Sequence, residues 1–277
     1  MTVAVYVDTH CHLQDQAFGE DVDAVMARAT TAGVIRMIDC GYDASSNAGV
    51  LELARRWDCV RPAVGFHPHE ASQVSPAMLT ELASQARTPG VAAIGEIGLD
   101  FYRDHSPHKV QRSVLSEQLE IAVRLGLPVS VHSRGAEHEI RDLLAPYAAG
   151  SPLAAQGRAV GVMHCFGGTL EQALCFVELG FLVSIACVAT YPRGEGTREL
   201  ARELPLESLV VETDSPYLPP QTMRGKRNEP AMVVAAVEAL AAARSIPVTE
   251  AAAATTSNAA RLFHLTLGAA SQEAVEV

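Results

Sequence analysis

The chain has 277 residues, of which 48% are hydrophobic and 19% charged, and its formal net charge at pH 7 is −11. This composition is typical of a globular protein and excludes a disordered or fibrous chain. The sequence lacks both a signal peptide and an apolar run of roughly 18 residues, so we expect no membrane association. Six scattered cysteines without a C-x-x-C pair favour reduced thiols in the cytoplasm. The acidic charge argues against a broad basic surface for nucleic acid.

Eight short apolar runs recur along the chain, and each is followed by a more polar segment. Continuous hydrophobicity in such runs is typical of parallel strands that are covered on both faces. The predicted strands span residues 3–8, 34–40, 60–66, 91–96, 128–132, 159–164, 181–186 and 209–213.

The segments between the runs carry helix signals. Ser75-Pro76 is a good N-terminal cap, and Gly126 and Gly180 stand where two helices should end. Predicted helices include residues 21–32, 43–57, 107–125, 169–179, 229–244 and 249–265. Eight alternating β and α units without a linker predict an α/β fold, a single (β/α)8 TIM barrel domain over residues 1–277 with an extra C-terminal helix. Residues 268–277 are predicted to form a frayed tail, and an open doubly wound sheet is the alternative fold.

Metal-binding residue types follow the predicted strands with unusual regularity. In a TIM barrel the functional groups lie at the carboxyl ends of the strands. The first run leads into His10 and His12, whose side chains face the same way in an extended chain. Later runs end in His67 and His69, Glu96, His132, His164 and Asp214. Glycines on both sides of Glu96 suggest room for the close approach of an ion.

Each of these residues has an ordinary alternative, such as a core histidine or a buried carboxylate paired with an arginine. Together, however, four imidazoles and two carboxylates converge on one barrel mouth, where burying them unpaired would be costly. The set consists of His10, His12, His132, His164, Glu96 and Asp214. It suits two divalent ions bridged by one carboxylate, a centre that activates water for hydrolysis. Asp214 is expected to bind metal and to accept the proton of that water. The metal is open among Zn²⁺, Mg²⁺ and Mn²⁺.

The assembled motifs resemble the TatD family of metal-dependent deoxyribonucleases, within the amidohydrolase superfamily. The resemblance covers about residues 4–266 and rests on segments 8–13, 65–69, 95–101, 128–134, 164–166, 212–218 and 224–230. It departs from the family at Gln14, where an aspartate is usual.

This resemblance implies a hydrolase of ester bonds, a 3′–5′ exonuclease acting on DNA or RNA ends. It also implies catalytic roles for Asp214 and Glu96. The implied ligands of one metal are His10, His12, Glu96 and Asp214, and those of the second are Glu96, His132 and His164.

Candidate substrate-binding residues also follow the predicted strands. TIM barrels often bind phosphate beside their last two strands, so cations there suit a phosphodiester, although solvated loop charge is the ordinary interpretation. Tyr102 could stack on a base. The candidates are His67, Tyr102, Arg134, Arg224, Lys226 and Arg227. Since only 5% of the residues are aromatic, a short grip on a strand end is favoured over a long stacking platform.

Two other functions stay open. An amidohydrolase or esterase acting at a carbonyl, such as a D-aminoacyl-tRNA deacylase or a small-molecule amide hydrolase, would use the same two-metal centre. A metal-stabilised scaffold is the non-enzymatic alternative. The basic segment 224–227 favours phosphate, whereas the acidic body favours a small substrate. The oligomeric state is open, with a monomer favoured.

Overall fold

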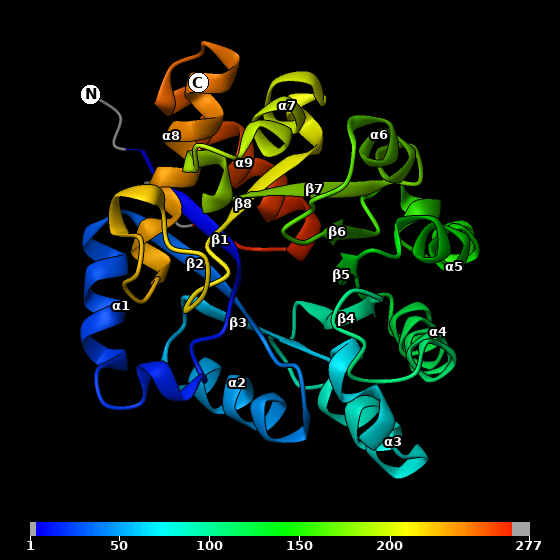
Figure 1. Cartoon of the computed structure of the whole chain (residues 1–277). Helices are drawn as coiled ribbons and strands as arrows, with labels where there is room; N and C mark the ends of the chain where they lie inside the picture. Colours follow the sequence, from blue (N-terminus) through cyan, green and yellow to red (C-terminus); the bar gives the residue numbers. More distant parts are fainter. Residues whose placement is uncertain (1–3, 268–277) are drawn as a thin grey trace.

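The computed structural model describes residues 4–267, in which eight strands form one sheet in the order β1 to β8 (Figure 1). All neighbouring pairs are parallel. The strands are β1 (Tyr6–Cys11), β2 (Val34–Cys40), β3 (Val60–Val64), β4 (Ala93–Asp100), β5 (Val129–Arg134), β6 (Gly161–Met163), β7 (Phe181–Ala186) and β8 (Leu209–Glu212). The predicted (β/α)8 barrel is confirmed.

Helices surround the strands on the outside of the barrel (Figure 1). They are α1 (Val22–Thr31), α2 (Ala44–Arg56), α3 (Pro76–Gln85), α4 (His108–Leu125), α5 (Glu137–Gly150), α6 (Leu170–Glu178), α7 (Glu195–Glu203), α8 (Val233–Arg244) and α9 (Val248–Phe263). Ser75 caps α3 by accepting from the Met78 amide, and Gly126 ends α4 in the left-handed conformation. Helix α9 is the predicted extra C-terminal helix. The predicted tail lies outside the described residues, and the single domain over residues 1–277 stays a prediction.

Strand β4 shows why the apolar runs are continuous. All eight of its residues are buried, because one face packs inside the barrel and the other faces the helices. Ile94, Ile97 and Leu99 are fully buried members of the main core cluster. Two carboxylates, Glu96 and Asp100, lie in the same buried strand. Buried charges need partners, so these two residues mark the end of the barrel where chemistry is expected.

The barrel closes between β1 and β8 at this same end. The Asp214 amide donates to the His10 carbonyl at 2.9 Å, and the His12 amide donates to the Ser215 carbonyl at 2.8 Å. One buried carboxylate reinforces the seam, since Asp8 accepts from the Thr213 amide at 2.9 Å and from the Thr213 hydroxyl at 2.6 Å. These contacts lie just beyond β8, so barrel closure also fixes the loop that carries Asp214.

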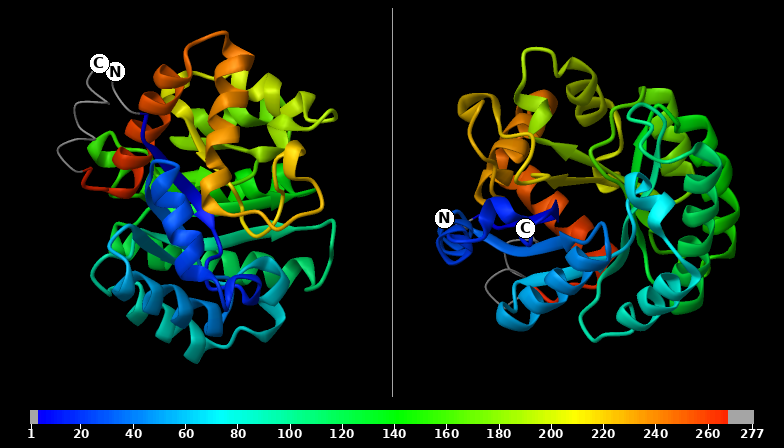
Figure 2. Two further views of the ribbon diagram at one scale, coloured as in Figure 1. Left: turned by 90° about the vertical axis from the view of Figure 1, so that its left-hand side faces the viewer. Right: turned by 60° about the horizontal axis from the view of Figure 1, so that its bottom comes forward.

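Helix α9 supports the other end of the seam. It packs against β1 and β8, and the two views of Figure 2 show it beside β1. Asn258 on α9 donates to the carbonyl of Leu209 at 2.7 Å, at the first residue of β8.

No single helix within residues 4–267 is long and apolar enough to cross a membrane. Residues 230–244 and 248–263 meet the length and composition criteria only as a pair, and their axes bend by 114° at the break. Both helices pack against barrel strands.

The close packing of β4 on β5 makes Gly98 a sensitive position. Its φ is +148°, and an added Cβ would collide with the backbone of His132. We expect Gly98→Ala to lower the free energy of unfolding by about 2–4 kcal/mol, from overpacking and backbone strain. Gly196→Ala, in an exposed turn of α7 with nothing within 4 Å of the new Cβ, should instead be neutral or stabilising by about 0.5–1 kcal/mol. Urea unfolding of both variants checks this, and equal stabilities would contradict it.

Candidate metal centre

A cavity of about 850 Å³ opens at the carboxyl ends of the strands. Its wall includes His12, His67, His69, Glu96, Asp100, His132, His164 and Asp214, from six different strand ends or the loops that follow them. The strand-end pattern in the sequence therefore does bring these side chains to one place. The cavity also includes Tyr42, Arg103, His105, Arg134 and Tyr217 at its rim.

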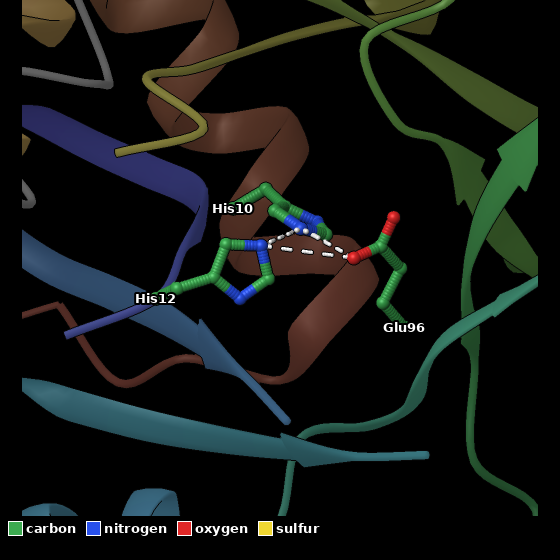
Figure 3. Close-up of side chains that lie close together, drawn as sticks. All are labelled: His10, His12 and Glu96. Carbon is green, nitrogen blue, oxygen red and sulfur yellow. Dashed lines mark hydrogen bonds and ion pairs between the residues drawn. The ribbon is translucent and has the colours of Figure 1, made fainter. Parts of the chain in front are cut away.

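Glu96 occupies the centre of this cluster and is only 5% exposed. Its Oε2 lies 3.5 Å from His10 Nε2 and 3.6 Å from His12 Nε2, as Figure 3 shows. Its Oε1 faces a different group, with His132 Nδ1 at 3.1 Å, His164 Nε2 at 3.3 Å and His67 Nε2 at 3.5 Å. The two oxygens of one carboxylate thus face two separate sets of imidazole nitrogens.

Asp214 stands beside the first of these sets. Its Oδ1 lies 3.6 Å from His12 Nε2, and its side chain is largely buried. The backbone of Asp214 has a φ of +57°, a left-handed conformation that non-glycine residues rarely adopt. The hydrogen bond from its amide to the His10 carbonyl holds it there. Such strain is common at functional sites, where the surrounding structure enforces the geometry.

Three of the histidines are oriented by contacts at the ring nitrogen that points away from Glu96. His12 Nδ1 lies 2.7 Å from the Cys40 carbonyl, which can only accept, so in the neutral ring Nδ1 carries the proton. His164 Nδ1 lies 3.0 Å from Glu212 Oε1, and His10 Nδ1 lies 3.2 Å from Ser130 Oγ. These contacts leave Nε2 of each ring directed at Glu96. Metal-binding histidines are oriented by the same kind of contact.

His67 is oriented the opposite way. Its Nδ1 accepts a hydrogen bond from the His69 amide at 3.2 Å, so the neutral ring carries its proton on Nε2. That Nε2 points into the cavity toward Glu96. His67 therefore presents a hydrogen-bond donor, as a residue that contacts substrate would.

The donor set fits divalent metal better than an ordinary buried ion pair. Among the described residues, the ionic partners of Glu96 are all histidines, so the alternative of a carboxylate paired with an arginine does not apply. The group His10–His12–Glu96 places nitrogen and oxygen atoms within 4.8 Å of one another. The group His67–Glu96–His132 does the same, although the His67 Nε2 in it carries a proton and acts as a donor. Imidazole and carboxylate ligands of this kind suit Zn²⁺ or Mn²⁺.

The charges of the cluster are strongly coupled. Burial alone would raise the pKa of Glu96, but the surrounding histidines hold it well below its usual range. Burial opposes protonation of His12, yet Asp214 and Glu96 raise its pKa to about 9. Burial lowers the pKa of His67 to about 3, which keeps this ring neutral. The pKa of Asp214 is lowered despite burial, mainly by His12, so this carboxylate is ionised at neutral pH.

The glycines around Glu96 serve a different purpose from the one expected. A Cβ on Gly95 would lie 2.7 Å from the Ser130 side chain, and one on Gly98 would meet the His132 backbone. A Cβ on Gly65 would lie 2.8 Å from the Gly95 backbone. These glycines therefore let β3, β4 and β5 approach one another beside Glu96. The interpretation that they leave room for an ion was wrong.

The candidate substrate-binding residues divide into two groups. Tyr102 is not among the described residues that line the cavity, but its ring is 68% exposed and its centre lies 4.2 Å from the guanidinium of Arg134. Arg134 and His67 line the cavity.

The three cations after β8 are not among the described residues that line the cavity. Arg227 pairs with Asp21 at 2.7 Å, and Arg224 lies over the ring of Tyr191. Lys226 is exposed. The cations that do reach the cavity, Arg103 and Arg134, follow β4 and β5.

Two buried carboxylates of the site were not selected from the sequence. Glu212 is fully buried on β8 and contacts His164, and Asp100 is 1% exposed and contacts both His69 and His132. Glu212 stands inside an apolar run two residues before Asp214, and Asp100 follows Glu96 on β4 with the same period-two alternation. That spacing was the available signal, but it could not show which histidines these carboxylates contact.

The barrel and a mouth built from histidines and carboxylates define a metal-dependent hydrolase. Comparison with known proteins gives the family. The sequence model of the TatD-related DNases matches residues 7–264, so the chain belongs to that family.

Relatives match over nearly their whole length. The 3′-5′ ssDNA/RNA exonuclease TatD of Salmonella typhimurium is 36% identical over 263 residues, which cover 93% of this chain and 98% of the relative. The uncharacterised metal-dependent hydrolase YabD of Bacillus subtilis is 33% identical over 259 residues, with coverages of 93% and 98%. The crystal structure of YjjV, a TatD homologue from Escherichia coli, matches with a TM-score of 0.87 at 36% identity and covers 94% of this chain and 98% of its own.

The protonated state of His12 predicts a pH-dependent metal affinity. With a pKa of about 9 in the metal-free protein, this imidazole carries a proton at pH 7 that a bound cation must displace. The apparent affinity for Mn²⁺ or Zn²⁺ should therefore rise by about tenfold per pH unit for each displaced proton, up to about pH 9. Titration calorimetry at pH 6, 7 and 8, in buffers of different ionisation enthalpy, measures both the affinity and the protons released. Metal uptake without proton release would contradict the expectation.

Proposed function

We propose that this protein is a metal-dependent 3′–5′ exonuclease that removes nucleotides from the ends of single-stranded DNA or RNA. The observation that carries the proposal is the division of the Glu96 carboxylate between two sets of imidazoles. The printed activity of the TatD exonuclease of Salmonella typhimurium, 36% identical over most of both chains, supports the substrate class.

The metal centre in this proposal holds two ions. His10, His12, Glu96 and Asp214 would hold one, and Glu96, His132 and His164 the other. The contacts of Glu96 with both sets support this division, and so does the placement of Asp214 beside His12. A pair of divalent ions supplies an activated water and polarises a phosphoryl oxygen. Imidazole-rich ligation favours Zn²⁺ or Mn²⁺, whereas phosphodiester chemistry is also served by Mg²⁺.

The protein's own groups supply the proton chemistry. Asp214 is ionised and faces the cavity, so it can accept the proton of the attacking water. His67 presents its Nε2–H to the same cavity and can donate to a phosphoryl oxygen as negative charge develops there. Glu96 is catalytic by holding both ions in place.

Substrate binding in this proposal uses the rim near β4 and β5. Tyr102 offers an exposed ring for a base, and Arg103 and Arg134 offer charge for phosphates. The acidic body of the protein repels the rest of a long strand, which fits a grip on a few terminal nucleotides. Arg224, Lys226 and Arg227 could contact a strand only outside the cavity. The cytoplasmic location and the monomeric state stay predictions.

Hydrolysis of end-labelled DNA tests the proposal. Single-stranded DNA labelled at the 3′ or the 5′ end is incubated with the protein and Mg²⁺, Mn²⁺ or Zn²⁺. We expect stepwise release of nucleotides from the 3′ end. Asp214→Asn, which keeps the shape of the side chain but loses the base, should lower kcat by about 10²–10⁴-fold.

A chelator should abolish turnover, and Arg56→Ala, an exposed change beside Trp57, should leave it unchanged. No cleavage with any metal would contradict the proposal. The same two-metal centre would then point to carbonyl chemistry, and D-aminoacyl-tRNA would be the next substrate to assay.

A further inference from the structure

Asp100, the last residue of β4, is a buried carboxylate that contacts two functional parts of the site at once. Its Oδ1 accepts hydrogen bonds from the amides of Tyr102 at 2.9 Å and Arg103 at 2.8 Å. Its Oδ2 lies 2.9 Å from His69 Nε2 and 3.4 Å from His132 Nε2. One oxygen therefore holds the backbone of the segment that follows β4, and the other faces the histidines.

The contact with His132 bears on which ring nitrogen is free for metal. His132 differs from His10, His12 and His164, because its Nδ1 rather than its Nε2 faces Glu96, at 3.1 Å. The buried Nε2 makes no hydrogen bond of good geometry with any described residue, and the atom that it faces is Asp100 Oδ2, a carboxylate oxygen 3.4 Å away. A carboxylate only accepts, so it favours the tautomer with the proton on Nε2 and a free lone pair on Nδ1.

The rim loop, residues 101–106, is held to the same residue through its backbone. The side-chain amide of Gln111 binds both backbone polar groups of Asp100. Its Oε1 accepts from the Asp100 backbone N–H at 2.9 Å, and its Nε2 donates to the Asp100 carbonyl at 3.0 Å. Gln111 Nε2 also donates to the Ser106 carbonyl at 2.8 Å, at the other end of the loop. Tyr102 therefore keeps its exposed ring on a fixed backbone.

The rim loop also contacts Arg134, the last residue of β5. The Phe101 amide donates to the Arg134 carbonyl at 2.9 Å, and the Arg134 guanidinium lies 4.2 Å from the Tyr102 ring. The Arg103 guanidinium lies farther off, 6.0 Å from the centre of the same ring. An exposed aromatic ring beside two arginines is a surface on which a nucleobase stacks while its phosphate meets positive charge.

We propose that Asp100 is a positioning residue. It fixes the position of the metal ligand His132 relative to the rim loop, on which a nucleobase stacks. The stacking surface takes the base of a nucleotide at the strand end while the scissile phosphate lies at the metal centre. The stacking half of the proposal rests on the proposed exonuclease function, whereas the His132 half requires only that the site binds metal.

Two substitutions at Asp100 separate its effect on metal binding through His132 from its effect on DNA binding through the rim loop. Asp100→Asn keeps an acceptor for the Tyr102 and Arg103 amides but places an NH₂ group against the Nε2–H of His132. We expect one of the two Mn²⁺-binding steps to weaken about 10–100-fold, with the dissociation constant for single-stranded DNA changed less than about twofold. Asp100→Ala removes both contacts and should weaken metal and DNA binding together.

Tyr102→Ala tests the stacking contact without touching the metal centre. It should weaken DNA binding about tenfold or more without altering metal binding, because it removes a stacking contact and no ligand. The matched control is Glu229→Gln, which alters another buried carboxylate, one that pairs with Arg28 at 2.7 Å rather than with any histidine. It should leave both constants at their wild-type values.

Calorimetric titration with Mn²⁺ and fluorescence anisotropy with a labelled single-stranded oligonucleotide in chelator measure the two constants without turnover. Circular dichroism confirms that each variant is folded. Wild-type metal affinity in Asp100→Asn would overturn the His132 half of the proposal. Wild-type DNA affinity in both Asp100→Ala and Tyr102→Ala would overturn the stacking half.

The outcome for wild-type protein distinguishes this proposal from the proposed function. If wild-type protein neither binds nor cleaves DNA, the exonuclease function fails and the stacking half fails with it. The metal titration of Asp100→Asn still decides the role of Asp100 toward His132 in that case.

Discussion

The site depends on one interaction, the contact of a buried carboxylate with five imidazoles. Glu96 lies in the middle of a strand whose every residue is buried, where an uncompensated negative charge would be very costly. Histidines that follow or belong to β1, β3, β5 and β6 surround it, so the charge is stabilised only when those strand ends meet. Barrel assembly and formation of the site are therefore the same event. Cations bound between these groups would replace the protons that His12 carries in their absence.

The seam of the barrel adds a second link between stability and chemistry. The hydrogen bonds that join β1 to the segment after β8 are made by the backbones of His10, His12, Asp214 and Ser215. Asp8 strengthens this seam through Thr213, next to the left-handed Asp214. A change that opens the seam would thus displace the proposed base and two proposed ligands together. The site sits on rigid strand ends rather than on free loops, which suits a geometry that must be held closely.

Much of the fold and of the cluster could be predicted from the sequence, because both follow from local patterns. Continuous apolar runs at regular spacing predict the eight strands, and side-chain alternation at their ends predicts which groups meet. The contacts across strands could not be predicted in this way. Arg227 looked like a phosphate ligand, but it pairs with Asp21, 206 residues away in the chain. The glycines beside Glu96 suggest room for an ion, but atoms of the neighbouring strands occupy that room. Asp100 and Glu212 could not be identified as site residues from the sequence, because only the folded barrel brings them to His132 and His164.

The most direct test of the account is the number of metal ions held by the wild-type chain and by Glu96→Ala. If Glu96 bridges the two sets of imidazoles, the wild-type protein should bind two Mn²⁺ per chain, about 3.5–4 Å apart in anomalous diffraction. Glu96→Ala should stay folded and bind neither ion tightly, because each set would lose its shared carboxylate. One ion in the wild-type protein, or two retained in folded Glu96→Ala, would contradict the central role assigned to this carboxylate.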